Sequence, residues 1–162
     1  MLDPLPLLLV DIDGVVCPMG SGCGDEILEF RGPDYLIWFS AGTPRRLRTL
    51  AHAFRLVWAS SMEENANRLF SPALVIPTLP FVAFSELPGR PGRSPKLRAV
   101  KQIGEIGALA WLDDEVGPDM VRWAGRRKAP TLIRPVDPRV GLNDDDVNAL
   151  LEFAAHVKSE QE

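Results

Sequence analysis

Four mostly apolar runs are spread along the chain, and segments with helical spacing lie between them. The runs cover residues 5–12, 55–60, 108–115 and 129–136. The first three show no alternation of apolar and polar positions, which is typical of strands in a parallel sheet that helices cover on both faces. We therefore expect four strands, and we expect the first three to be buried.

Helical spacing of apolar residues predicts five helices. They are expected near residues 43–54, 61–70, 94–104, 117–127 and 143–157. Four of these segments begin with a residue whose side chain can cap a helix, namely Thr43, Ser61, Ser94 and Asn143. Because strands and helices alternate, the predicted fold class is α/β, a three-layer sandwich with a mainly parallel, Rossmann-like sheet.

Two segments of the chain are predicted to be irregular. Residues 14–42 hold a Gly-rich loop and then two apolar stretches around the turn sequence RGPD, which predicts a small flap hairpin. Residues 71–93 are rich in proline and glycine and predict a loop with one extended piece near residues 81–84. Neither segment is long enough for a cap domain, so residues 1–162 are expected to form a single domain without one.

Composition and charge narrow the class of protein. A chain of 162 residues suits one domain with one sizeable core. The net charge of −4 argues mildly against a general nucleic-acid-binding surface. No apolar run reaches the roughly 18 residues of a membrane span, and the N-terminus lacks the basic start of a signal peptide. We therefore expect no membrane partner and a cytoplasmic location, where the two cysteines stay as free thiols.

Two of the predicted strands run directly into pairs of carboxylates, Asp11 with Asp13 and Asp113 with Asp114. Reactive groups of an open parallel sheet lie at the carboxyl ends of its strands, so these four side chains are expected in one pocket. Two like charges about 4 Å apart repel by on the order of 4 kcal/mol near a protein surface, which a cation would relieve. Mg²⁺ prefers carboxylate, carbonyl and phosphate oxygens. The sequence therefore predicts a Mg²⁺ site beside a phosphoryl group.

Four motifs, in this order, resemble those of the haloacid-dehalogenase-like (HAD-like) hydrolase superfamily. They are VDIDGVV with Asp11 and Asp13, VWAS ending in Ser60, the lysine Lys96, and WLDDE with Asp113 and Asp114. Together they span residues 5–119. The stretches LVWASSMEENANRLF and AWLDDE are also similar to a small, capless bacterial branch related to the phosphatase-like domains of RNA-repair proteins.

The resemblance implies a role for each residue of the motifs. Asp11 would be the nucleophile that forms an aspartyl-phosphate, and Asp13 would be the general acid and base. Ser60 would donate a hydrogen bond to a phosphoryl oxygen. Lys96 would neutralise the phosphoryl group and hold Asp11 in place. These roles suit phosphoryl transfer, which depends mostly on positioning and charge neutralisation.

The resemblance also implies a set of metal ligands. Asp11 and the main-chain carbonyl of Asp13 would bind Mg²⁺, and Asp113 and Asp114 would complete its shell. Which of the last two binds the ion directly stays open. Asp119 has two interpretations as well, because it could assist the metal or could simply be a favourable charge in the first turn of a helix.

The identity of the motif lysine is a further open point. The helix predicted at 94–104 holds Lys96, Arg98 and Lys101. Lys96 is favoured because it lies in the first turn, nearest the strand ends. A cation at that position interacts unfavourably with the helix dipole, which suggests that Lys96 has another role.

The expected function is a Mg²⁺-dependent phosphatase that hydrolyses a phosphate monoester. Asp13 favours phosphate esters over carbon–halogen bonds, since the dehalogenase branch of the superfamily has no matching acid there. An open site without a cap suits a phosphorylated substrate as large as a macromolecule. Two alternatives stay open: a phosphatase of nucleic-acid ends in RNA or DNA repair, and a non-catalytic domain that keeps the fold for binding or regulation.

Overall fold

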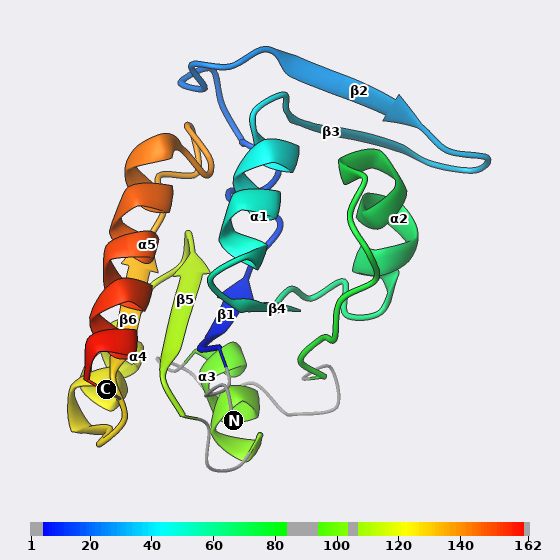
Figure 1. The fold of residues 1–162 in the computed structure, drawn as a ribbon. Coiled ribbons are helices and arrows are strands. Elements are labelled where there is room, and N and C mark those ends of the chain that lie inside the picture. The colour runs from blue at the N-terminus through cyan, green and yellow to red at the C-terminus, as the bar shows by residue number, and fades with distance from the viewer. Residues whose placement is uncertain (1–4, 84–93, 104–106, 161–162) are drawn as a thin grey trace.

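The computed structural model describes residues 5–83, 94–103 and 107–160 (Figure 1). In chain order, its helices and strands are β1 (Leu7–Val10), β2 (Ile27–Arg31), β3 (Leu36–Ser40), α1 (Thr43–Ala51), β4 (Arg55–Trp58), α2 (Asn65–Leu74), α3 (Pro95–Gln102), β5 (Leu109–Asp113), α4 (Pro118–Arg126), β6 (Thr131–Pro135) and α5 (Asp144–Ser159).

A four-stranded parallel sheet contains all four strands expected from the apolar runs. Its strand order is β4-β1-β5-β6, and every neighbouring pair is parallel. The first strand is shorter than the apolar run that predicted it. The strands β2 and β3 form a separate antiparallel hairpin, as predicted for the flap.

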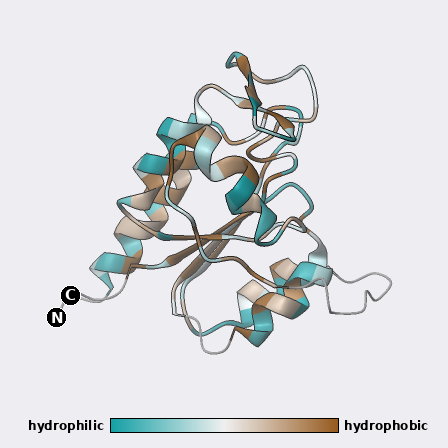
Figure 2. Ribbon diagram, turned by 90° about the vertical axis from the view of Figure 1, so that its right-hand side faces the viewer, coloured by the Kyte–Doolittle hydropathy of each residue, from teal (hydrophilic) through white to brown (hydrophobic). Residues whose placement is uncertain are grey.

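Helices cover both faces of this sheet. Neighbouring residues of a strand point to opposite faces, and the buried apolar residues divide in the same way: Leu8 and Val10 belong to one cluster and Leu9 to the other. The first cluster includes residues of α1, α2 and α5, and the second includes residues of α3 and α4. Figure 2 shows the strands as a largely hydrophobic layer between helices of mixed hydropathy. The α/β class is confirmed, and the arrangement is compatible with a Rossmann-like sandwich.

The direction in which the chain winds reverses at β1. From β1 the chain passes through the hairpin and α1 to β4 on one side, and then returns to β5 on the other side of β1. Parallel sheets form a crevice at the carboxyl ends of the strands where such a reversal occurs. The residues that follow β1, β4 and β5 therefore share one edge of the sheet.

The predicted helix starts are confirmed at two places and wrong at two others. Ser94 and Asn143 cap α3 and α5 with their side chains. Thr43 is not a cap, because it is already the first helical residue and Gly42 takes the cap position. Ser61 is not a cap either: α2 begins at residue 65, after turns over residues 61–64.

The loop predicted at residues 71–93 is partly wrong, because α2 continues through Pro72 to residue 74. Proline has no N–H to donate to the carbonyl four residues earlier, which here belongs to Arg68. That carbonyl instead accepts a hydrogen bond from the Tyr35 hydroxyl at 3.1 Å. Asp34 also pairs with the Arg68 guanidinium at 3.2 Å. The proline inside α2 therefore leaves an acceptor that ties the tip of the hairpin to this helix.

Other predictions lie at the limits of the described residues. Phe81 forms an isolated parallel bridge with Trp58, which confirms an extended piece at this point. Residues 84–93 of the predicted loop lie outside the described residues, and so does residue 104, the predicted end of the helix at 94–104. No helix in the three described ranges is long and apolar enough to cross a membrane.

Candidate active site

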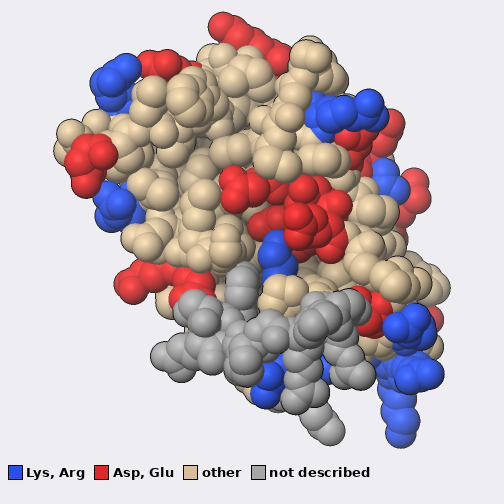
Figure 3. Space-filling view, turned by 180° about the vertical axis from the view of Figure 1, so that it is seen from behind, with Lys and Arg blue, Asp and Glu red and all other residues tan. Residues whose placement is uncertain are grey.

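Three acidic side chains meet at the carboxyl edge of the sheet. Asp11 directly follows β1, and Asp113 is the last residue of the neighbouring strand β5. One carboxylate oxygen from each of Asp11, Asp113 and Asp114 lies within 4.8 Å of the others. Figure 3 shows that acidic side chains gather near the centre of the molecule's back face, with a basic side chain beside them. The structure thus brings together three of the four carboxylates of the sequence motifs.

Lys96 lies between two of these carboxylates. It belongs to the first turn of α3, and its Nζ is 2.8 Å from Oδ2 of Asp11 and 2.8 Å from Oδ2 of Asp113. Only 16% of the lysine side chain is exposed. Because three carboxylates and, among the described residues, one ammonium meet here, the group keeps an excess of negative charge when all its members are ionised.

Burial controls the ionisation of Asp11. It raises the pKa of this carboxyl from 3.8 to about 7, Lys96 opposes the shift, and the negative charge of Asp113 adds to it. Burial alone would lower the pKa of Lys96, but the combined attraction of the two aspartates raises it above its ordinary value. A second cation at this place would therefore help to keep Asp11 ionised near neutral pH.

This shift makes stability depend on pH. A carboxyl with a raised pKa in the folded state contributes stability that is present below the unfolded pKa of 3.8 and is lost as the pH rises through about 7. In buffers with a chelator, Asp11→Asn should be more stable than the wild type, by a margin that widens up to about pH 7 and then levels off. Thermal melts across this range measure the margin. A margin that does not change with pH would contradict the raised pKa of Asp11.

A tight turn follows β1, the strand that leads into the first motif. The carbonyl of Ile12 accepts hydrogen bonds from the amides of residues 15–17, and Gly14 has a left-handed backbone with φ of +75°. A Cβ on Gly14 would lie only 2.6 Å from Cγ of Asp114. Glycine therefore allows both the turn and the close approach of Asp114. The carboxyl of Asp13 is exposed and lies outside the group of three.

Ser60 follows β4, which pairs with β1 on the side opposite β5. Ser60 is buried, and its Oγ accepts a hydrogen bond from the amide of Met62 at 3.3 Å. Its carbonyl accepts the amide of Glu63 at 3.0 Å, so the residue also shapes the turn before α2. Since the Ser60 hydroxyl is the acceptor in its contact with Met62, its hydrogen can be donated to an anion at the sheet edge.

Asp113 and Asp114 have different surroundings. Asp113 is fully buried. Its Oδ2 accepts a hydrogen bond from Lys96, and its Oδ1 accepts a hydrogen bond of 3.0 Å from the amide of Glu115. Asp114 is half-buried and lies nearer the surface. Three converging carboxylates with excess negative charge fit a hard divalent cation such as Mg²⁺. Of the two neighbours, Asp114 is better suited to bind the ion directly, because both oxygens of Asp113 already accept hydrogen bonds.

Asp119 does not belong to the carboxylate group. Its Oδ2 accepts a hydrogen bond from the backbone amide of Ser94 at 2.9 Å, which joins the first turn of α4 to the start of α3. Sequence reasoning did not predict this contact. Its only sequence signal is an acidic residue in a first helical turn, and that signal is common to many helices.

Comparisons with known proteins do not assign the chain to a group. No protein-family model matches the chain, and no curated protein matches it. Function therefore has to be inferred from the side chains at the sheet edge.

Proposed function

We propose that this chain is a Mg²⁺-dependent phosphatase of the HAD-like hydrolase superfamily, which hydrolyses a phosphate monoester through an aspartyl-phosphate. The observation that carries the proposal is the group at the sheet edge: the buried Asp11 pairs with Lys96 and lies within 4.8 Å of carboxylate oxygens of Asp113 and Asp114. The parallel sheet, with a hairpin as the next element after its first strand, supports the superfamily assignment.

In the first half of the proposed reaction, a carboxylate oxygen of Asp11 attacks phosphorus. A phosphorus–oxygen bond to Asp11 forms while the bond to the leaving-group oxygen breaks. The exposed Asp13 gives its proton to that leaving oxygen, and the alcohol departs. Lys96 neutralises charge on the other phosphoryl oxygens and Ser60 donates a hydrogen bond to one of them, because positioning and charge neutralisation are the main requirements of this chemistry.

In the second half, Asp13 takes a proton from a water molecule as the water oxygen attacks phosphorus. The bond between phosphorus and Asp11 breaks, inorganic phosphate leaves, and Asp11 returns to a carboxylate. Mg²⁺, when held by Asp11, Asp114 and the main-chain carbonyl of Asp13, would neutralise charge on the phosphoryl group. Asp113 would then serve mainly to hold Lys96.

The anchoring of the hairpin supports a large substrate. Its tip is tied to α2 by Tyr35 and Asp34, and its base is tied to α1 through Asp25, which pairs with Arg46. Such a hairpin is fixed at both ends and is poorly suited to close over a small molecule. We propose that the phosphate is carried on a macromolecule, such as a phosphoprotein or a nucleic-acid end.

Phosphate release from a panel of substrates tests this function. The panel holds sugar phosphates, nucleotides, phosphopeptides, and oligonucleotides with a 3′- or 5′-phosphate. Release from at least one of them is expected with Mg²⁺, should fall to background with a chelator, and should return when Mg²⁺ is added in excess. Activity that persists in the chelator would contradict the metal requirement, and no release from any member of the panel would contradict the function.

A further inference from the structure

We propose that Asp119 is a positioning residue that holds Lys96 in place through the backbone of Ser94. This inference rests on the proposed phosphatase function and gives Asp119 a role different from metal ligation. Its carboxylate reaches the start of the helix that carries Lys96, and it is absent from the group of three carboxylates at the sheet edge.

The contact acts at the point where the chain enters α3. Ser94 is the N-cap of this helix, and its Oγ accepts the amide of Leu97 at 3.4 Å. Asp119 accepts the amide of the same Ser94 at 2.9 Å. Lys96 lies only two residues further on, and its Nζ makes two ion pairs of 2.8 Å. A shift of the Ser94 backbone would therefore move the Cα of Lys96, and the Lys96 side chain with it.

Apolar packing holds the rest of α3 independently of this hydrogen bond. Leu97 and Val100 are buried in one cluster with Met120, the residue after Asp119. The first turn of α4 thus shares an apolar cluster with α3 and binds the N-cap of α3 through a carboxylate. Without the carboxylate, the packed part of α3 should remain, while the start of the helix and Lys96 lose their restraint.

Gly117 supports the orientation of the Asp119 carboxylate. A Cβ on Gly117 would lie 2.6 Å from Oδ1 of Asp119, so the side chain folds back over this glycine. The backbone of Gly117, with φ of −89° and ψ of 160°, suits alanine equally well. The variant Gly117→Ala therefore displaces the Asp119 carboxylate without removing any charge.

The test compares Asp119→Ala, Asp119→Asn and Gly117→Ala at saturating Mg²⁺, with thermal melts to confirm that each variant is folded. Asp119→Ala and Gly117→Ala should lower kcat by about 100-fold with little change in KM, as expected for a group misplaced by about 1 Å. Asp119→Asn should recover most of kcat, because its amide oxygen still accepts the Ser94 amide. In a Lys96→Ala background, Asp119→Ala should cause no further loss.

A second readout does not depend on turnover. Mass spectrometry can follow how fast an amine-reactive reagent modifies Lys96, and the rate should rise at least several-fold in Asp119→Ala but not in Asp119→Asn. An unchanged rate in Asp119→Ala would overturn the positioning role. Equal loss of kcat in Asp119→Asn and Asp119→Ala, with a higher Mg²⁺ requirement, would show that Asp119 is a metal ligand. A wild type without phosphatase activity but with this pattern of Lys96 modification would overturn the proposed function alone.

Discussion

Replacement of Asp11 by asparagine is expected to abolish hydrolysis of phosphate esters and to leave the protein folded. The amide has nearly the shape of the carboxylate, but its oxygen is a poor nucleophile and cannot form the acyl phosphate. Loss of a nucleophile typically lowers kcat by a factor on the order of 10⁴ or more. Phosphate release and circular dichroism, measured on the same preparation, test the two halves of this expectation.

The matched control for this variant is Glu115→Gln. It also removes one negative charge close to the carboxylate group, but the Glu115 side chain is exposed and only its backbone amide contacts Asp113. Its kcat should stay close to that of the wild type. If Asp11→Asn kept measurable turnover, Asp11 could not be the nucleophile. If Glu115→Gln lowered kcat by as much as Asp11→Asn, the loss would come from removing any negative charge near the site.

Asp11→Asn should lose activity without losing stability, which is not expected when a residue of the apolar core is replaced. Asp11 is buried, and its only ammonium partner among the described residues, Lys96, is shared with Asp113. The amide removes one repelling charge from the group, and Lys96 keeps its ion pair with Asp113. Charged groups at catalytic sites often lower the stability of the folded protein, so a more stable neutral variant is typical of such a site.

The convergence of Asp11 with Asp113 could be predicted from the sequence. Apolar runs without alternation require strands that are buried on both faces, and such strands are parallel and share a carboxyl edge. The approach of Lys96 was predictable from its place in a first helical turn, where a cation has no favourable interaction with the helix itself. Local patterns were sufficient for these residues because each lies within a few positions of the end or start of an element.

Other features depend on contacts between distant segments. Thr43 has a typical capping side chain, but the turn at Gly42 places it one position inside the helix. Pro72 predicts a break in a helix, yet its missing hydrogen bond is compensated because Tyr35 from the hairpin binds the freed carbonyl. The bond from Asp119 to the Ser94 amide joins the starts of two helices. No local pattern encodes which of these partners will meet in the folded chain.

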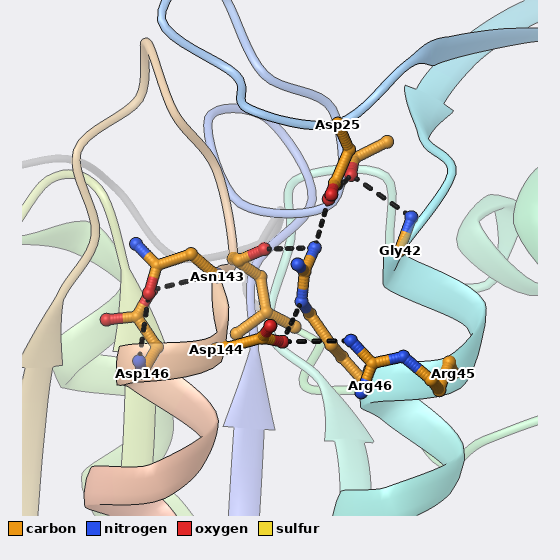
Figure 4. A network of polar contacts seen from close by, with 9 residues as sticks. Asp25, Gly42, Arg45, Arg46, Asn143, Asp144 and Asp146 are labelled. Atoms are coloured by element: carbon orange, nitrogen blue, oxygen red, sulfur yellow. Dashed lines mark hydrogen bonds and ion pairs between the residues drawn. The ribbon is translucent and has the colours of Figure 1, made fainter.

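Replacement of Arg46 by alanine should destabilise the protein far more than replacement of an exposed arginine. Arg46 joins three segments, since its Nη1 contacts Asp25 of the hairpin base and its Nε contacts Asp144 of α5 at 2.8 Å (Figure 4). Its Nη1 also donates to the Leu142 carbonyl at 3.2 Å, and Ser40 donates to the same Asp25 at 2.6 Å. The Arg46 side chain is only 7% exposed. Breaking a buried ion pair costs about 3–5 kcal/mol, and because Asp25 keeps some contact with water we expect about 2–4 kcal/mol.

Urea unfolding measures this loss, and Arg45→Ala is the matched control. Arg45 pairs with the same Asp144 at 2.9 Å, but its side chain is 61% exposed, so its removal should change the free energy of unfolding very little. If both variants lost the same free energy of unfolding, burial of Arg46 could not be the cause of its larger expected effect. The hydrogen bond from Arg46 holds the pKa of Asp25 below its usual range, so this stabilisation is present above the unfolded pKa and is lost on acidification. The difference between Arg46→Ala and the wild type should therefore shrink below about pH 4.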